Sequence, residues 1–208
     1  IDNPRTDWCF RTESEPGLND RKLLYPRGKT LGGCSSINGM IYMRGQARDY
    51  NHWALETAES QWAWEEALPD FMAHESHFSF DGKVNEYATN IDFHCAKGEW
   101  RVEQQRLRWD ILDAFSVAAV QSGIPATKDF NTGDNFGVGY FEVNQRNGWR
   151  WNTAKAFLNP IRKKRSNLTI VTKAQAKRLL FTQQEDDSPK CTGLELVHQG
   201  NVLKVQAC

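Results

Sequence analysis

The sequence predicts a mixed α/β fold, and three features support this prediction. Apolar residues recur at helical spacing in two segments, residues 107–122 and 153–164. Segments rich in β-branched and aromatic residues, separated by turn residues, fill the chain after residue 167. Near the N-terminus, a glycine pair at positions 32 and 33 interrupts a run of small and basic residues, as in a turn that leads into a helix.

The first quarter of the chain predicts loops and one short helix. Residues 1–24 are polar and turn-rich. Residues 47–54 predict a short helix, because Tyr50 and Trp53 lie three positions apart and would share one face.

A second helix is predicted over residues 64–76, with Leu68, Phe71 and Met72 facing inward. Pro69 should confine this helix to its first turn or kink it, because proline lacks the amide donor. Residues 77–106 show no clear period and predict an extended excursion.

The strongest helix prediction covers residues 107–122, which glycine and proline then stop. Its expected core face consists of Ile111, Leu112, Phe115, Ala118 and Ala119. Residues 129–139 predict a loop and residues 140–143 a strand. A helix over residues 153–164, interrupted by Pro160, should follow. Strands are expected at residues 168–171, 174–182, 192–198 and 202–206.

The composition excludes several classes of protein. Basic and acidic residues balance at 26 each, so nothing indicates a nucleic-acid partner or an anionic membrane surface. Apolar residues make up 39% of the chain, and no run approaches the roughly 20 residues of a membrane-spanning helix. The five cysteines include no C-x-x-C pair, which favours a reducing compartment. We expect a cytoplasmic protein and leave peripheral membrane association open.

Residues 25–53 form the most informative segment, because they have the parts of a cofactor cradle. Two basic residues precede the glycine pair, which removes two side chains and lets backbone approach a ligand. We expect Ser35 or Ser36 to cap a short helix over residues 37–43. The start of that helix would be an anion site, since free N–H groups and the helix dipole both favour negative charge.

This segment closely resembles the signature of the glucose–methanol–choline (GMC) family of flavin oxidoreductases. The matching residues are Pro26-Arg27-Gly28-Lys29, Leu31-Gly32-Gly33, Ser35-Ser36, Asn38-Gly39-Met40, Tyr42, Arg44-Gly45, Asp49-Tyr50 and Trp53. Weaker similarity follows, in the family's order, at Asp7-Trp8 and at residues 64–76, 152–160 and 167–181. The choline-dehydrogenase-like or alcohol-dehydrogenase-like branch is the most similar. The resemblance implies part of an FAD-binding domain joined to part of a substrate domain.

In that family this segment lies along flavin adenine dinucleotide (FAD). The resemblance places backbone at Thr30, Gly32 and Gly33 beside the pyrophosphate and ribitol, and Asn38, Gly39, Met40 and Ile41 beside the isoalloxazine. It places the backbone of Ala176 at the adenine ring, although an ordinary strand residue is an equally good interpretation. Family members that tether the flavin covalently use a histidine in or just after this loop. Residues 37–38 contain none, so we expect non-covalent FAD.

The resemblance also divides the chain into three segments. Residues 1–60 would be the FAD-binding segment with the glycine-rich loop, residues 61–150 a partial substrate-domain excursion, and residues 151–208 a helix plus strands of the FAD-binding domain. The family's N-terminal G-x-G-x-x-G fingerprint and its C-terminal catalytic histidine are absent from this sequence. We therefore expect an internal fragment that is inactive alone, and we assign no catalytic residue.

The reaction implied by the resemblance is oxidation of a primary alcohol, such as choline or an aliphatic or aromatic alcohol, with hydride transfer to flavin N5. One alternative is a GMC-type alcohol oxidase or a lyase relative. Another is a non-catalytic remnant of the FAD fold that acts as an interaction module. The sequence indicates neither the electron acceptor nor the oligomeric state.

The histidines give no clear metal signal. His74 and His77 are three positions apart, as two ligands on one helix face would be, and His94 follows later. No acidic or cysteine partner lies at a convincing spacing. We expect surface histidines and no metal site.

Overall fold

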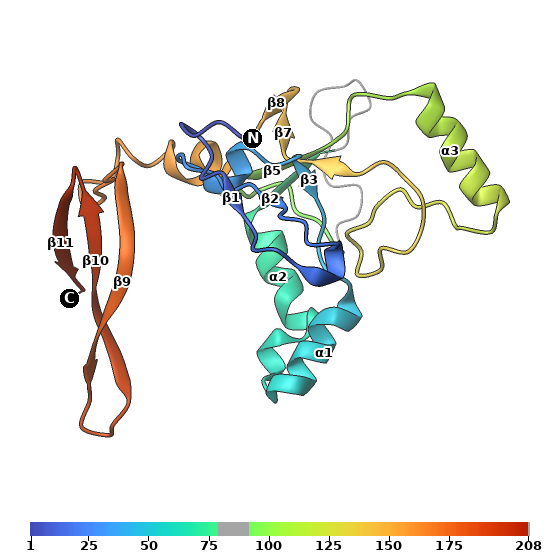
Figure 1. Ribbon diagram of the computed structural model, residues 1–208. Coiled ribbons are helices and arrows are strands. Elements are labelled where there is room, and N and C mark those ends of the chain that lie inside the picture. The colour runs from blue at the N-terminus through green and yellow to red at the C-terminus, as the bar shows by residue number, and fades with distance from the viewer. Residues whose placement is uncertain (79–91, 208) are drawn as a thin grey trace. The chain divides into compact units, whose positions relative to one another are not determined.

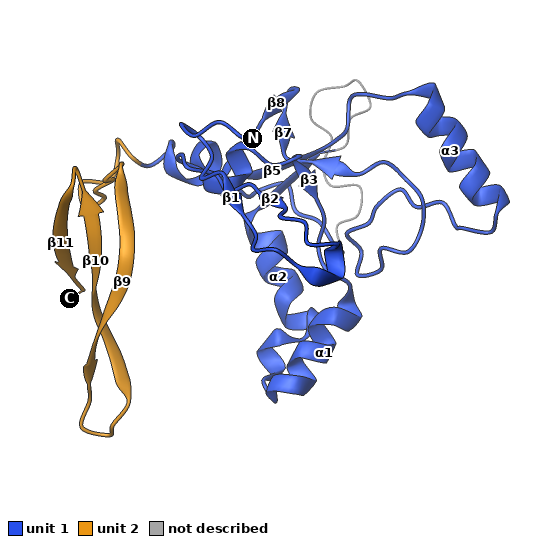
Figure 2. Ribbon diagram, in the orientation of Figure 1, with its two compact units in different colours: residues 1–161 blue, residues 162–208 orange. Residues whose placement is uncertain are grey.

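The computed structural model describes residues 1–78 and 92–207. The chain divides into two compact units, Ile1–Ile161 and Arg162–Cys208 (Figures 1 and 2). Helices and several separate sheets are present, so the mixed α/β fold is confirmed. The division into FAD-binding and substrate-domain segments stays a prediction. In the described part of the chain, no helix is both long and apolar enough to cross a membrane.

A four-stranded sheet forms the centre of the first unit. Its strand order is β3 (Ile41–Tyr42), β6 (Glu142–Val143), β5 (Trp100–Gln104) and β4 (Glu75–Phe78). β4 and β5 run parallel, and the other neighbours are antiparallel. The sheet is the core of this unit, because Val102 of β5 has no exposed surface. The pairing of β3 with β6 brings segments that lie about a hundred residues apart in the sequence side by side.

Two helices follow β3, as the sequence predicts. α1 (Ala47–Thr57) and α2 (Trp64–His74) are linked by a short 3-10 turn, Ser60–Trp62. They pack through aromatic rings, because the Tyr50 ring lies 5.6, 5.5 and 5.8 Å from those of Trp53, Trp64 and Phe71. α2 continues past Pro69, so the proline does not confine the helix to its first turn.

α3 (Asp110–Gln121) confirms the strongest helix prediction, but its expected core face is wrong. Among the five residues assigned to that face, Ala119 is buried, whereas Ile111 is 71% exposed and Phe115 is 66% exposed. Helical spacing identifies an apolar face, but it does not show that another element covers that face.

The rest of the first unit consists of short elements. β1 (Phe10–Arg11) pairs with β2 (Leu24–Tyr25), and β7 (Gln145–Arg146) forms a hairpin with β8 (Trp149–Arg150). A 3-10 turn covers Pro16–Leu18. The helix predicted over residues 153–164 is wrong in extent: a π-type turn covers Ala154–Leu158, and the chain then continues as turns through Pro160.

The second unit is an antiparallel three-stranded sheet in the order β11-β10-β9. Its strands are β9 (Ala174–Gln183), β10 (Pro189–His198) and β11 (Asn201–Gln206), which confirms three predicted strands. The strand expected over residues 168–171 is wrong, because that segment has irregular conformation.

Candidate functional site

The chain is anchored directly before the glycine-rich loop. Asp7 is 1% exposed, and its carboxylate accepts hydrogen bonds from the backbone N–H groups of Cys9, Asp2 and Arg27 at 3.0, 2.8 and 2.9 Å. These three donors hold the pKa of the Asp7 carboxyl below its usual value, with the Cys9 donor contributing most. Arg27 is thereby fixed one residue before Gly28, where the loop begins.

The helix predicted over residues 37–43 is wrong. The loop instead contains one 3-10 turn, η2 (Gly33–Ser36), and Ile41–Tyr42 belong to β3. Gly32 and Gly33 adopt left-handed conformations with φ of 90° and 53°, so the turn starts earlier than serine capping would place it. A four-residue turn has no developed helix dipole, and the anion site inferred from such a dipole is lost with it.

The glycines of the loop differ in what surrounds them. A Cβ on Gly32 would lie 2.6 Å from Ser36 Oγ and 3.2 Å from Asn152 Cγ, so the protein itself requires glycine there. A Cβ on Gly28 would overlap the carbonyl of Gly33. Gly33 and Gly39, in contrast, have no described protein atom within 4 Å of such a Cβ. These two glycines leave backbone open on one side of the loop, as close approach of a ligand requires.

A second segment, residues 150–153, holds the other side of the loop. The Thr153 N–H donates to Ser35 Oγ at 3.0 Å, and the Thr153 hydroxyl donates to the Gly32 carbonyl at 3.2 Å. The Asn152 side-chain amide donates to Ser36 Oγ at 2.9 Å. Ser35 and Ser36 therefore link two segments rather than capping a helix.

The loop ends at a residue in an unusual backbone conformation. Met40 has φ of 67°, which costs a non-glycine residue roughly 1–2 kcal/mol. The side-chain oxygen of Asn38 accepts the Met40 N–H at 3.1 Å, and the Met40 carbonyl accepts the Asn144 N–H at 2.8 Å. Strained residues that are held in this way gather at functional sites. The next two side chains point in opposite directions, because Ile41 is 51% exposed and Tyr42 is buried.

Behind β3, buried charged groups form a continuous cluster. Arg44 Nη2 lies 2.9 Å from Glu75 Oε1, and the other oxygen of Glu75 accepts a hydrogen bond from His94 Nδ1 at 2.9 Å. His94 Nε2 donates to Asp129 at 2.9 Å. The Arg44 N–H donates to the side-chain oxygen of Asn131 at 2.8 Å, which ties the strand end to the loop after α3. Such buried ions are tolerated because each has an opposite partner.

The carboxylates around His94 keep it protonated. Burial alone would lower its pKa, but the hydrogen bonds to Asp129 and Glu75 outweigh burial and raise the pKa to about 9. The same contacts act on the acids. Burial would raise the pKa of Glu75 and of Asp129, yet the hydrogen bond from His94 holds both below their usual values. His94 is thus an imidazolium with both ring nitrogens donating.

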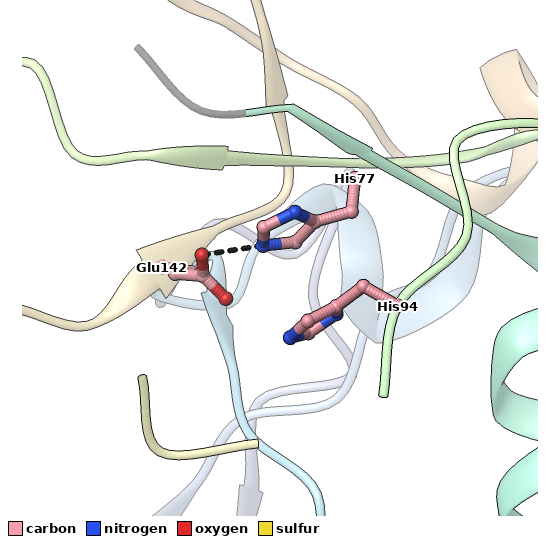
Figure 3. Close-up of side chains that lie close together, drawn as sticks. All are labelled: His77, His94 and Glu142. Carbon is pink, nitrogen blue, oxygen red and sulfur yellow. Dashed lines mark hydrogen bonds and ion pairs between the residues drawn. The ribbon is translucent and has the colours of Figure 1, made fainter. Parts of the chain in front are cut away.

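A metal ion is the alternative occupant of this region. His77, His94 and Glu142 are buried, and their possible ligand atoms lie within 4.8 Å of one another (Figure 3). His77 Nε2 already contacts Glu142 Oε1 at 2.5 Å, and the two imidazole rings stack at 3.9 Å with 22° between their planes. Nearly parallel rings do not aim their lone pairs at one point, and His94 has no free nitrogen. The geometry fits hydrogen bonds between these side chains better than it fits a tetrahedral metal ion.

This cluster was not predicted from the sequence. The spacing of His74 and His77 is that of two ligands on one helix face, but His74 ends α2 while His77 lies in β4. The expectation of surface histidines is wrong for His77 and His94, each 3% exposed. The partners Glu75, Asp129 and Glu142 come from separate loops and strands, and no local spacing reveals such long-range pairs.

The structure gathers most of the predicted cofactor residues on one segment. Seven of them lie on the loop and the start of β3: Thr30, Gly32, Gly33, Asn38, Gly39, Met40 and Ile41. Ala176 lies in β9, in the second unit, and is exposed. The supporting residues Arg150 and Thr153 were not predicted, because their contacts span more than a hundred residues. The open glycine backbone fits an extended ligand such as FAD lying on the loop.

Comparison with known proteins gives the same family. The model of the GMC oxidoreductase family matches residues 10–207. The chain is 36% identical over 181 residues to an alcohol dehydrogenase [acceptor] of Pseudomonas putida, covering 87% of this chain and 31% of that protein. It is 34% identical to the mitochondrial choline dehydrogenase of Mus musculus, covering 93% of this chain and 30% of that protein. The chain thus spans about a third of the length of these curated relatives.

Solved structures with the same fold include two oxidases. Pyridoxine 4-oxidase from Mesorbium loti is 30% identical with a TM-score of 0.83, and the match covers 97% of this chain and 37% of that one. A formate oxidase matches with a TM-score of 0.79 at 22% identity, over 99% of this chain and 34% of that one. On the match of its family model and of these relatives, the chain belongs to the GMC oxidoreductase family, whose N-terminal domain binds FAD.

Proposed function

We propose that this chain supplies the flavin-facing loop of an FAD-dependent oxidoreductase that acts on the CH–OH group of a primary alcohol, such as choline or an aliphatic or aromatic alcohol. The observation that carries the proposal is the loop itself. Its backbone is open at Gly33 and Gly39, and residues 150–153 hold it from the other side. The alcohol dehydrogenase and choline dehydrogenases among the relatives support the class of substrate.

In this proposal the chain binds and orients the cofactor. Bound FAD supplies the hydride acceptor, and it is held without a covalent bond. Backbone at Thr30, Gly32 and Gly33 would contact the pyrophosphate and ribitol, and residues 38–41 would contact the isoalloxazine. The backbone of Ala176, an exposed residue of β9, would contact the adenine. Backbone donors that are fixed before the cofactor arrives lose little entropy on binding.

Alcohol oxidation also needs a base for the hydroxyl proton. The two buried histidines are poor candidates for that role. His94 already donates from both nitrogens to carboxylates, and His77 contacts Glu142. We assign no catalytic residue to this chain.

Flavin titration of the natural-length protein that carries this sequence tests the proposal. Quenching of flavin fluorescence reports binding, and reduction of a dye by choline and by aliphatic and aromatic alcohols reports turnover. A protein that binds no FAD would refute the proposal. Bound FAD that no alcohol reduces would favour the non-catalytic alternative. Residues 1–208 expressed alone, run in parallel, show whether this part binds FAD by itself.

An oxidase is the second candidate, because pyridoxine 4-oxidase is among the similar structures at 30% identity. Oxidases pass electrons to oxygen, so hydrogen peroxide would form in step with alcohol consumption. A dehydrogenase that uses another electron acceptor would reduce the dye without forming hydrogen peroxide.

A further inference from the structure

Arg150 makes an unusual set of contacts with the glycine-rich loop. It lies in β8 and is half-buried. One terminal nitrogen donates to the Ser35 carbonyl at 3.0 Å and to the side-chain oxygen of Asn38 at 2.8 Å. The other terminal nitrogen donates to the Asn38 carbonyl at 2.7 Å. A planar guanidinium can hold several acceptors in a fixed arrangement, which a lysine ammonium cannot do as well.

The charge of Arg150 has no anionic partner among the residues that the structure describes. No ion pair involves Arg150 there, and its three acceptors are neutral oxygens of the loop. Arg101, which is also half-buried, differs in this respect, because it contacts Glu103 at 2.9 Å. The guanidinium therefore brings net positive charge to the end of the loop at Asn38.

The same contacts reach the strained residue. The Asn38 side-chain oxygen accepts two hydrogen bonds, one from the Arg150 guanidinium at 2.8 Å and one from the Met40 N–H at 3.1 Å. Arg150 thus orients the side-chain amide of Asn38, which in turn holds Met40 in its left-handed conformation. Without this support, the turn at residues 38–40 would sample other conformations and lose its fixed shape.

We propose that Arg150 is a positioning residue for the flavin: by holding Asn38, it fixes the left-handed turn at Met40 and places positive charge at the isoalloxazine end of the loop. The inference rests on the proposed function for the identity of the ligand, whereas the positioning of the loop is a property of the chain alone. The flavin gains negative charge on reduction, so the charge would favour the reduced form.

The test compares Arg150→Met and Arg150→Lys with Arg146→Met in the natural-length protein. Arg146 lies in the partner strand of the same hairpin, and its guanidinium stacks on Trp151 at 5.1 Å, so the control removes the same charge nearby. Three quantities are measured: hydrogen exchange of the Met40 amide without FAD, the dissociation constant for FAD, and the midpoint potential of the bound flavin.

We expect Arg150→Met to accelerate exchange at Met40, to weaken FAD binding about tenfold and to lower the midpoint potential. Arg150→Lys should restore the potential, because it keeps the charge, but it should not restore slow exchange. Arg146→Met should leave all three close to wild type. Wild-type exchange and affinity in Arg150→Met would overturn the proposal, as would equal losses in Arg146→Met.

The test remains decisive in two further cases. If the wild-type protein binds no FAD, the proposed function fails, while exchange at Met40 still shows whether Arg150 holds the loop. If Arg150→Met does not fold, the Arg150→Lys variant decides: fast exchange at Met40 supports the proposal, and slow exchange refutes it.

Discussion

Nδ1 of His94 lies 2.9 Å from the carboxylate of Glu75, and neither side chain has any exposed surface. Glu75 also pairs with Arg44, and His94 also pairs with Asp129, so a chain of alternating charges crosses the interior. Arg44 comes two residues after β3, which continues directly from the glycine-rich loop. The cluster therefore holds the far end of the segment that we expect to face the flavin.

This cluster predicts how stability depends on pH. His94 has a raised pKa of about 9, so its contribution is fully present below pH 6.5 and is lost as the pH rises through about 9. The pKa values of Glu75 and Asp129 are lowered, so their contributions are present above about pH 4.5 and are lost as the pH falls. The melting temperature should be highest between about pH 4.5 and 6.5.

The fall in melting temperature at basic pH can be assigned to one residue. The raised pKa of His94 corresponds to about 3 kcal/mol of stability lost by pH 9. In His94→Gln the fall in melting temperature between pH 6.5 and 9 should be much smaller. Thermal unfolding of the wild type and of the variant at a series of pH values measures this fall. An equally large fall in the variant would contradict the assignment.

Breaking the cluster from its centre should be costly. Glu75→Gln leaves Arg44 and His94 buried with less compensation, and loss of one partner in a buried pair typically costs about 3–5 kcal/mol. Glu13→Gln is the matched control, because the Glu13 side chain is 98% exposed and lies 3.8 Å from Lys22. That control should change stability by less than about 0.5 kcal/mol. Urea unfolding measures the free energy of unfolding of both variants. Similar losses in the two variants would contradict a stabilising role of the Glu75 contacts.

The sequence predicts helices and strands where the pattern is local. α1, α2 and the three strands of the second unit follow from spacing and turn residues within short windows. The helix expected over residues 37–43 fails because conformations with positive φ at Gly32, Gly33 and Met40 break the segment on both sides. A pattern of small residues shows that a turn is present, but it does not fix its backbone angles.

The candidate site shows the same limit. The loop residues were predicted by resemblance, since they are contiguous in sequence. The residues that hold the loop, Arg150 and Thr153, are separated from it by over a hundred positions. The buried cluster forms where β4 and β6 of one sheet meet three segments outside the strands, which carry Arg44, His94 and Asp129. Single-sequence patterns do not contain these pairings.

Substitution of the open glycines should separate cofactor binding from folding. Gly39 has open space around it and no left-handed φ, so Gly39→Val should leave the melting temperature of the apo protein nearly unchanged. Its side chain would occupy the space expected for FAD and weaken binding about tenfold or more. Gly33→Val should abolish FAD retention, and it should also cost roughly 1–2 kcal/mol because Gly33 has φ of 53°.

The control for these variants is Gly17→Val, where a Cβ would meet Glu15 Oε1 at 3.8 Å, away from the loop. Equilibrium titration with FAD and thermal unfolding without FAD are measured side by side. Stoichiometric FAD at wild-type affinity in Gly39→Val and Gly33→Val would show that the loop does not face the cofactor.

The flavin should dissociate when the protein is denatured. Residues 28–45, which contain the loop, include no histidine that could form a covalent link. The loop does contain Cys34, an exposed thiol whose sulfur accepts the Gly28 N–H at 3.5 Å, and a thiol is a potential second point of attachment. Acid precipitation of the flavin-loaded natural-length protein should leave a yellow supernatant and a colourless pellet. Yellow colour that stays in the wild-type pellet would refute the prediction. The Cys34→Ser variant would then identify the link, because it keeps a small polar side chain and removes the sulfur. A colourless pellet in that variant would place the covalent link at the Cys34 thiol.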